Sequence, residues 1–330
     1  MRRRNALALA AAGTTLGSIR PATAQTPTVR MIGFGGISNL PIWVAQRRGF
    51  FAREGFAVED TDTPGSIRQF RDIMSGNCDV IVTAIDNIVA YTEGQGPASF
   101  PDMDVFAFLG GDTGLNYLVV RPEIKTYADI KGKTVVVDAL TTGYAFLLFR
   151  ILELHGLVVH RDFDVIGIGE GGRRLQAMED GKAVAAVMST AQVRHALTLG
   201  FNVLATPAQA LGGKYQSSVY ATRRSWAAGH RSTILGIIRA IRAANDVIFT
   251  DRAGAMATMN EHLKGLSPAD ATATFDSLID PNSGLIRSGA IDVDGVRTVL
   301  SMRNEFAVPK KNLMDPLKYV DLSYYQRIVR

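Results

Sequence analysis

The sequence predicts an α/β protein built of two lobes, with the chain crossing between them twice. The first observation is an alternation, from residue 29 to residue 205, of short β-branched or aromatic runs with segments of helical periodicity. The second is that this alternation starts again at Lys131, after a strand at 115–121 that we expect to be antiparallel or to cross between lobes. The third is a long helical tail that follows a last strand at 217–222. Such alternation is typical of parallel sheets with helices on both faces.

The expected elements follow from apolar spacing and from helix start and stop signals. Pro41 suits the first turn of a helix, Gly76 suits a C-terminal cap, and Thr142 can cap the helix beside it. Strands are predicted at 29–34, 56–60, 79–82, 105–109, 115–121, 134–137, 164–168, 184–188, 202–205 and 217–222, and helices at 67–74, 143–154, 171–179, 190–199 and 234–249. We expect residues 25–118 and 215–330 to form one lobe, which includes the C-terminal helices, and residues 119–214 to form the other.

The first 24 residues have the layout of an export signal. Arginines at 2–4 form a positive start, residues 6–17 are an apolar stretch, and residues 22–24 (Ala-Thr-Ala) fit a small-residue cleavage site. The adjacent arginines leave both the Sec and the twin-arginine routes open. We therefore expect residues 1–24 to be a signal peptide and the mature protein to be soluble and periplasmic.

Composition excludes several classes of protein. The 330 residues contain one cysteine, Cys78, so a disulfide framework and a cysteine-rich metal site are excluded. Four of the 36 Lys and Arg residues lie in the first 24 residues, which hold no acid, so the remainder has 32 basic against 31 acidic residues. That balance does not support a nucleic-acid partner.

Catalytic and cofactor signatures are weak or missing. Residues 167–172 (GIGEGG) match G-x-G-x-x-G between a strand and a helix. A dinucleotide site would add a carboxylate about twenty residues on, but no Asp or Glu occurs from Gly181 to Asn245. The sequence also lacks G-x-x-x-x-G-K-[ST], G-x-S-x-G and H-E-x-x-H. We expect no cofactor, no metal and no catalytic residue.

Polar residues cluster directly after the predicted strands. In open α/β sheets ligands bind beyond the carboxyl ends of the strands, so these residues could surround a small molecule. For any one of them, a helix cap is an equally good interpretation. The candidates are Ser38, Asn39, Gly65, Asp86, Asn87, Asp112, Thr141, Thr142, Glu170, Ser189 and Thr190.

Five segments, taken in order, resemble the nitrate/sulfonate/taurine-type substrate-binding proteins of ABC transporters, a group that includes relatives of the thiamine-pyrimidine synthases. They are residues 39–45 (NLPIWVA), 49–55 (GFFAREG), 76–80 (GNCDV), 118–133 (LVVRPEIKTYADIKGK) and 178–186 (MEDGKAVAA). The resemblance implies a two-lobed type II periplasmic binding protein fold, with a ligand cleft between lobes joined by two crossovers. It also implies hinge closure, a small-molecule ligand, an ABC permease in the inner membrane as partner, and a monomer. Mapped by position, it adds Gly143 to the ligand-binding candidates.

The ligand chemistry stays open at this point. A carboxylate facing the cleft, such as Asp86, disfavours a plain oxyanion unless it is paired. Asp86, Asp112 and Glu170 together suit an amine or a pyrimidine, whereas Arg173 could neutralise Glu170 and leave room for an aromatic or carboxylate ligand. The alternatives to a transport protein are an enzyme on the same scaffold, similar to a pyrimidine synthase, and an exported sensor domain.

Overall fold

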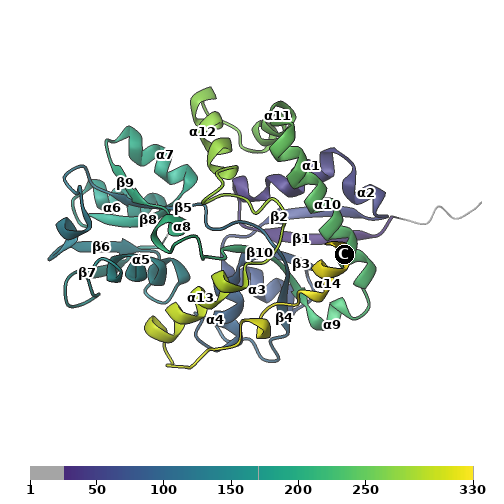
Figure 1. Ribbon diagram of the computed structural model, residues 1–330, viewed down its shortest axis with the longest axis horizontal. Helices are drawn as coiled ribbons and strands as arrows, with labels where there is room; N and C mark the ends of the chain where they lie inside the picture. The colour runs from purple at the N-terminus through teal and green to yellow at the C-terminus, as the bar shows by residue number, and fades with distance from the viewer. Residues whose placement is uncertain (1–25, 170, 330) are drawn as a thin grey trace, which may run out of the picture.

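Two five-stranded sheets form the centres of two lobes that lie side by side in the computed structural model (Figure 1). The structure describes residues 26–169 and 171–329, and the signal peptide expected at 1–24 lies outside them. The first sheet has the order β2-β1-β3-β10-β4 and the second has the order β7-β6-β8-β5-β9. The strands are β1 (Thr28–Gly33), β2 (Ala57–Asp62), β3 (Val80–Ala84), β4 (Val105–Gly110), β5 (Asn116–Val120), β6 (Thr134–Val137), β7 (Asp164–Gly167), β8 (Ala185–Ser189), β9 (Asn202–Ala205) and β10 (Ser218–Arg223).

The two sheets share one plan. In the first sheet β1 pairs in parallel with β2 and β3, and in the second β6 pairs in parallel with β7 and β8. A crossover strand then joins each sheet in the antiparallel direction, β10 beside β3 and β4, and β5 beside β8 and β9. The prediction that the 115–121 strand is antiparallel is confirmed. The parallel strands expected from the β/α alternation form one part of each sheet, and each sheet also receives one antiparallel strand from the connection with the other lobe.

Helices surround both sheets, and the five helices predicted by range correspond to α3, α5, α6, α7 and α10, whose starts lie within a few residues of the predicted ones. The helices are α1 (Leu40–Arg47), α2 (Phe50–Arg53), α3 (Ser66–Met74), α4 (Ile85–Thr92), α5 (Gly143–Glu153), α6 (Gly171–Glu179), α7 (Thr190–Thr198), α8 (Pro207–Ala210), α9 (Arg224–Ala227), α10 (Arg231–Thr250), α11 (Arg252–His262), α12 (Pro268–Leu278), α13 (Val293–Phe306) and α14 (Ser323–Val329), with short 3-10 turns η1 (Ile37–Asn39), η2 (Tyr127–Ile130) and η3 (Pro316–Lys318).

The two crossovers lie against each other. The first runs from Gly110, the end of β4, to Asn116, the start of β5, and the second leads into β10 at Ser218. The amide of Gly111 donates to the carbonyl oxygen of Ser218 at 2.9 Å. The amide of Ser217 donates to the carbonyl oxygen of Asp112 at 3.1 Å. These hydrogen bonds form a two-stranded connection of the kind about which lobes can hinge.

The C-terminal helices contact both lobes. Helix α10 packs on α1 and α2 around the first sheet. Helix α12 contacts α7 of the second lobe, and Arg194 of α7 donates to Asp270 of α12 at 2.9 Å. Helix α13 contacts α4 of the first lobe and α5 of the second, as its central position in Figure 1 shows. The sheets place β5 wholly in the second lobe, and the division of the chain at residues 118 and 214 stays a prediction.

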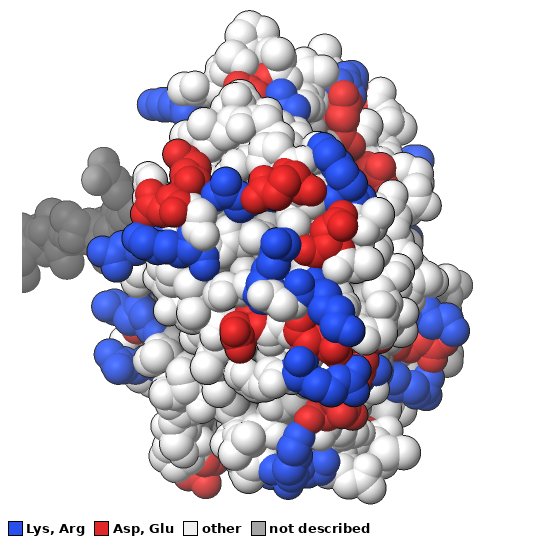
Figure 2. Space-filling model, turned by 90° about the vertical axis from the view of Figure 1, so that its left-hand side faces the viewer, with Lys and Arg blue, Asp and Glu red and all other residues white. Residues whose placement is uncertain are grey.

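Charges of both signs mix on the outer end of the second lobe (Figure 2). Ion pairs in this lobe include Arg161 with Asp162 at 2.7 Å and Lys182 with Asp180 at 2.8 Å. A broad basic surface, which a phosphate backbone needs, does not occur on the described part of this face. Among the described residues, no helix is long and apolar enough to cross a membrane.

Candidate functional site

A cavity of about 560 Å³ lies where the two lobes and the crossovers meet. Its walls come from the loops that follow strands of both sheets, which is where parallel strands expose their carboxyl ends. The first lobe contributes Phe34, Ser38, Asn39, Gly65, Ser66, Thr83, Asp86 and Asn87; the crossovers contribute Asp112, Leu115, Asn116, Tyr215 and Ser217; and the second lobe contributes Asp138, Thr142, Gly143, Tyr144, Gly171, Arg174 and Ser189.

Most of the predicted ligand-binding residues line this cavity. They are Ser38, Asn39, Gly65, Asp86, Asn87, Asp112, Thr142, Gly143 and Ser189. Thr141 is exposed and Thr190 is buried, and neither lines the cavity. Glu170 lies outside the described residues. The structure therefore brings nine predicted residues together, and their binding of a ligand stays a prediction.

Five helices direct their N-terminal ends at the cavity. The first residue or the cap of α3, α4, α5, α6 and α7 lies in its wall: Ser66, Ala84, Gly143, Gly171 and Ser189. Helix N-termini carry unpaired N–H groups and a positive dipole end. The caps of α3 and α4, Gly65 and Ala84, make no side-chain hydrogen bond to their helices. The cavity is therefore surrounded by positive partial charge from both lobes.

Some of the predicted side chains already serve as caps. The Thr142 hydroxyl accepts from the amide of Ala145 at 3.2 Å and donates to the Asp138 carboxylate at 2.6 Å. The Ser189 hydroxyl donates to the Gln192 side chain at 3.0 Å. Thr142 therefore caps α5, and Ser189 forms a capping box with Gln192, so both hydroxyls have intramolecular partners.

The Asp86 carboxylate in the cavity wall is paired with an arginine from far along the chain. Arg303 of α13 donates from Nε to Oδ1 at 2.7 Å and from an Nη to Oδ2 at 2.6 Å. The exposed fractions of the two side chains are 1% for Arg303 and 6% for Asp86. Asp86 therefore brings no unpaired negative charge to the cavity.

Asp112 is also satisfied within the protein. It lies in the first crossover, and its carboxylate accepts from the hydroxyls of Ser38 and Ser218 and from the amide of Gly114. The Ser38 bond, at 3.2 Å, ties the loop after β1 to the crossover. Asp112 therefore organises the crossover side of the cavity with hydrogen-bond donors rather than with a counter-charge.

Two tyrosines that the sequence analysis did not select line the cavity. Tyr144 is 39% exposed, and partial loss of hydration, with Asp112 and Asp138 acting in the same direction against Asn116 and Arg174, raises the pKa of its phenol. Burial, reinforced by Asp86, raises the pKa of Tyr215 well above its usual value. Both phenols are therefore protonated at neutral pH and can donate a hydrogen bond to a ligand. Tyr144 lies in the first turn of α5, directly after the Thr142 cap, whereas nothing in the spacing of Tyr215 indicates its position.

The arginine in the wall is Arg174, one residue from the one that the sequence analysis considered. Arg173 is exposed, whereas Arg174 is buried in the first half of α6. Arg174 donates to the carbonyl oxygens of Gly169 and Val187. Because an α-helix has 3.6 residues per turn, adjacent side chains point to different faces. Only the packing of α6 decides which of the two arginines faces inward.

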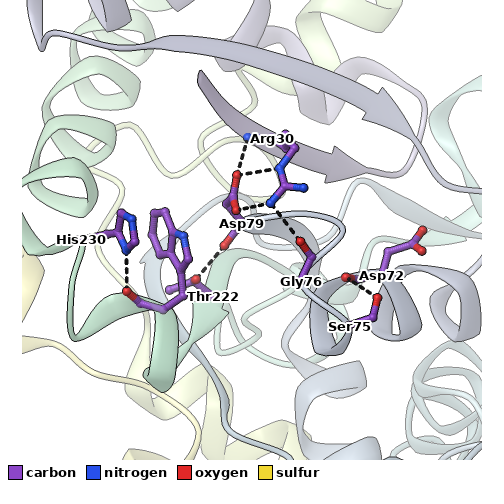
Figure 3. A network of polar contacts seen from close by, with 8 residues as sticks. Arg30, Asp72, Ser75, Gly76, Asp79, Thr222 and His230 are labelled. Carbon is purple, nitrogen blue, oxygen red and sulfur yellow. Dashed lines mark hydrogen bonds and ion pairs between the residues drawn. The ribbon is translucent and has the colours of Figure 1, made fainter. Parts of the chain in front are cut away.

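Another polar network lies outside the cavity lining (Figure 3). Arg30 of β1 holds the Asp79 carboxylate at 2.7 and 3.1 Å, and the Thr222 hydroxyl of β10 donates to the Asp79 carbonyl oxygen at 2.6 Å. His230 bonds the carbonyl oxygen of Trp226 at 2.8 Å. The first contacts join β1 and β10 to the residue before β3. The His230 contact links α9 to the residue that precedes α10. We therefore interpret the network as structural.

The comparison with protein families decides the classification. The family model described as NMT1/THI5 like matches residues 37–255, which include much of the cavity wall. The chain belongs to the NMT1/THI5-like family. This family match confirms the resemblance found in the sequence.

Solved structures share the fold of this NMT1/THI5-like chain. The periplasmic aliphatic sulphonate binding protein SsuA of Escherichia coli aligns with a TM-score of 0.68 at 17% identity, over 86% of this chain and 87% of its own. The periplasmic nitrate-binding protein NrtA of Synechocystis PCC 6803 aligns with a TM-score of 0.71 at 11% identity, over 92% and 89%. The chain therefore has the two-lobed fold of periplasmic binding proteins.

A curated relative matches a part of the chain. YtlA of Bacillus subtilis (strain 168), itself a candidate binding protein, is 28% identical over 128 residues. The match spans 38% of this chain and 37% of YtlA, so it covers little more than a third of either protein.

Proposed function

We propose that the protein captures a small organic molecule with an anionic group between its lobes and delivers it to an ABC importer. The observation that carries this proposal is the convergence of the N-termini of α3, α4, α5, α6 and α7 on one cavity. Oriented N–H groups and helix dipoles favour negative charge without requiring a metal or a cofactor. SsuA and NrtA, whose fold the chain shares, bind a sulphonate and nitrate respectively.

From the sequence alone, the carboxylates of the cavity are expected to repel an anion. In the structure their intramolecular partners weaken this repulsion. Asp86 is neutralised by Arg303, and the charge of Asp112 is spread over two hydroxyls and an amide. A hydroxyl of Thr142 donates to Asp138. With Asp86 neutralised, and with Asp112 and Asp138 held by hydrogen bonds from neutral donors, we favour an anion drawn by the helix N-termini over the amine or pyrimidine that unpaired carboxylates would attract.

The size of the cavity favours an organic ligand over a bare oxyanion. A volume of about 560 Å³ lies within the range of roughly 300–1,000 Å³ that is usual for small-molecule sites. Phe34, Leu115 and Tyr144 give the wall an apolar part, and polar groups from the strand-end loops surround it. This combination suits a sulfonate or a carboxylate that carries an aliphatic or aromatic body.

Binding without chemistry is supported by the residues that line the cavity. Among the described lining residues there is no histidine, lysine or cysteine to act as base, Schiff-base former or nucleophile. Cys78 is buried in the core of the first lobe, and burial raises the pKa of its thiol to about 12. We therefore favour a transport protein over a synthase of the same family, and infer export to the periplasm from the basic and apolar start of the chain.

The test is a thermal-shift screen of the purified protein against alkanesulfonates, nitrate, aromatic acids, pyrimidines and amines. A ligand that binds the folded state raises the melting temperature by mass action, with about 2.7 kcal/mol gained at 100 times the dissociation constant. We expect the largest shifts with organic anions. No shift in any class contradicts a binding role, and conversion of a ligand to a new product, followed by NMR, contradicts binding without chemistry.

A further inference from the structure

The pair Asp86–Arg303 joins the cavity wall to the C-terminal helix α13. Asp86 lies in the first turn of α4, and its partner lies 217 residues later. The two parallel hydrogen bonds make the pair bidentate, the geometry that guanidinium and carboxylate groups hold most firmly. With exposed fractions of 1% and 6%, the pair is almost wholly removed from water.

The pair is also in contact with the second lobe. The backbone of Gly143, the first residue of α5, lies so close that a Cβ there would be 2.4 Å from Oδ2 of Asp86. The Arg303 guanidinium lies 5.3 Å from the ring centroid of Phe146, also on α5. Its Nη1 atom is buried without a hydrogen-bond partner among the described residues. The arginine is therefore enclosed between α4 and α5, directly behind the cavity wall.

We propose that Arg303 determines the charge preference of the cavity by neutralising Asp86. This inference rests on the proposed function, because it concerns the same cavity. Arg303 does not line the cavity, so it acts as a positioning residue through Asp86. Without the guanidinium, the carboxylate would face the ligand as a charge in a site of low dielectric constant, where its interaction with an ion is strong. The cavity would then repel anions and attract cations.

A purely structural role for the pair predicts a different pattern. A strap that only stabilises the fold would change the affinity for ligands of every charge by a similar factor. A charge-setting role instead changes the ratio between the affinities of an anion and of a cation of equal size. That ratio is the decisive measurement, because loss of stability alone does not move it in a charge-dependent way.

The experiment uses isothermal titration calorimetry with two probe series, the first matched in shape and the second matched only in its alkyl chain. One is benzoate, benzamide and benzamidine, and the other is propanesulfonate, propanesulfonamide and propylamine. They are measured on the wild-type protein, on Arg303→Met, on Asp86→Asn and on the double variant. Arg297→Met is the matched control, since it removes an arginine from an exposed position of the same helix.

We expect the wild-type protein and Arg297→Met to prefer the anions. In Arg303→Met the ratio of anion to cation affinity should fall by about 100-fold or more. The double variant, which removes both charges, should recover this ratio to within about tenfold of wild type. If Arg303→Met does not fold, the same ratio is compared between Asp86→Asn, which keeps the guanidinium, and the double variant. We expect it to be at least about tenfold higher in Asp86→Asn.

Two outcomes contradict the inference, and they are distinguishable. A wild-type protein that prefers the anions, with the same ratio in every folded variant, overturns the role of Arg303 and leaves the proposed function in place. A wild-type protein that binds no probe of either series, or that prefers the cations, overturns the anion preference in the proposed function and the inference with it.

Discussion

The two ends of helix α4 carry the same kind of interaction in different surroundings. At the first end Asp86 is paired with Arg303, and both side chains are buried against the second lobe. At the last end Glu93 accepts from Lys311 at 3.0 Å, from Lys318, and from the Tyr319 hydroxyl at 2.9 Å. The partners at both ends come from the C-terminal segment 303–319, which therefore holds α4 like a strap.

The difference between the ends is access to water. The Glu93 side chain is 5% exposed, but the lysines that approach it are 35% and 53% exposed. A lysine that loses this partner can return to solvent, whereas Arg303 and Asp86 cannot. An exposed ion pair contributes about 0–1 kcal/mol, while removal of one partner from a buried pair costs about 3–5 kcal/mol. The ion pairs of Glu93 therefore mainly fasten the C-terminal segment to α4. At the other end, loss of either Asp86 or Arg303 would leave a buried charge without a partner beside the cavity.

The largest effect is expected from Arg303→Met, which tests the buried end. The variant leaves a buried carboxylate without a counter-charge, so the free energy of unfolding should fall by about 3–5 kcal/mol in urea denaturation. The double variant Asp86→Asn/Arg303→Met should recover most of this loss, because no unpaired charge remains. A loss below about 1 kcal/mol in Arg303→Met would show that water reaches the pair.

Gly143→Ala tests how closely the second lobe approaches the buried end. Its Cβ would lie 2.4 to 2.9 Å from atoms of Asp86, which Arg303 holds in place, so the lobes should close less far. We expect ligand affinity to fall at least about tenfold, because a loss of about 1.4 kcal/mol in the binding free energy corresponds to that factor. The unfolding free energy of the unliganded protein should change by less than about 1 kcal/mol.

Calorimetry with the best ligand of the thermal-shift screen measures this loss. Gly229→Ala is the matched control, because a Cβ at that position meets no atom within 4 Å. Equal affinities in the two glycine variants would mean that the contact between Asp86 and α5 does not limit closure.

Glu93→Gln tests the half-exposed end and has a pH dependence. Burial opposes the charged form of Glu93, but the hydrogen bonds from Lys318, Lys311 and Tyr319 together hold its pKa below the ordinary value of 4.5. The stability that this depressed pKa contributes is present above pH 4.5 and is lost as pH falls through the lower folded value. At pH 7 the variant should lose about 1–2 kcal/mol.

Urea denaturation between pH 7 and pH 3 measures this effect. The difference between wild type and Glu93→Gln should shrink on acidification, because wild-type Glu93 becomes protonated. A difference that stays constant over this range would show that the strap depends on packing rather than on the carboxylate.

The smallest effect is expected from the exposed pair Arg297–Asp294 on the same helix as Arg303. Its side chains are 59% and 55% exposed, so Arg297→Met should change the unfolding free energy by less than about 0.5 kcal/mol. Measured by the same urea denaturation, the loss in Arg297→Met is the reference against which the losses in Arg303→Met and Glu93→Gln are compared. A loss near that of Arg303→Met would mean that charge on α13, rather than burial, controls stability.

Much of the fold follows from local sequence patterns. The β-branched run at 134–137, the Thr142 cap and the apolar spacing after it correspond to β6 and α5 as observed. That the residues after the strands lie close together could also be predicted from the sequence. The carboxyl ends of parallel strands meet at one edge of a sheet, so position along a strand predicts position in the molecule.

The remaining features depend on segments that are distant in sequence. Asp86 was expected to face the ligand as a carboxylate, and only the packing of α13 brings Arg303 to it. The choice of Arg174 over Arg173 depends on how α6 lies against the second sheet. The antiparallel placement of β10 between β3 and β4 likewise requires the chain to return from the second lobe to the first sheet.

The sequence by itself therefore determined the elements, the two-lobed plan and nine residues of the cavity wall, because periodicity, capping and strand ends are local properties of the chain. Only the tertiary structure decided the charge of the cavity. Electrostatic interaction depends on distance in space and on burial, and the partner of Asp86 lies 217 residues away along the chain.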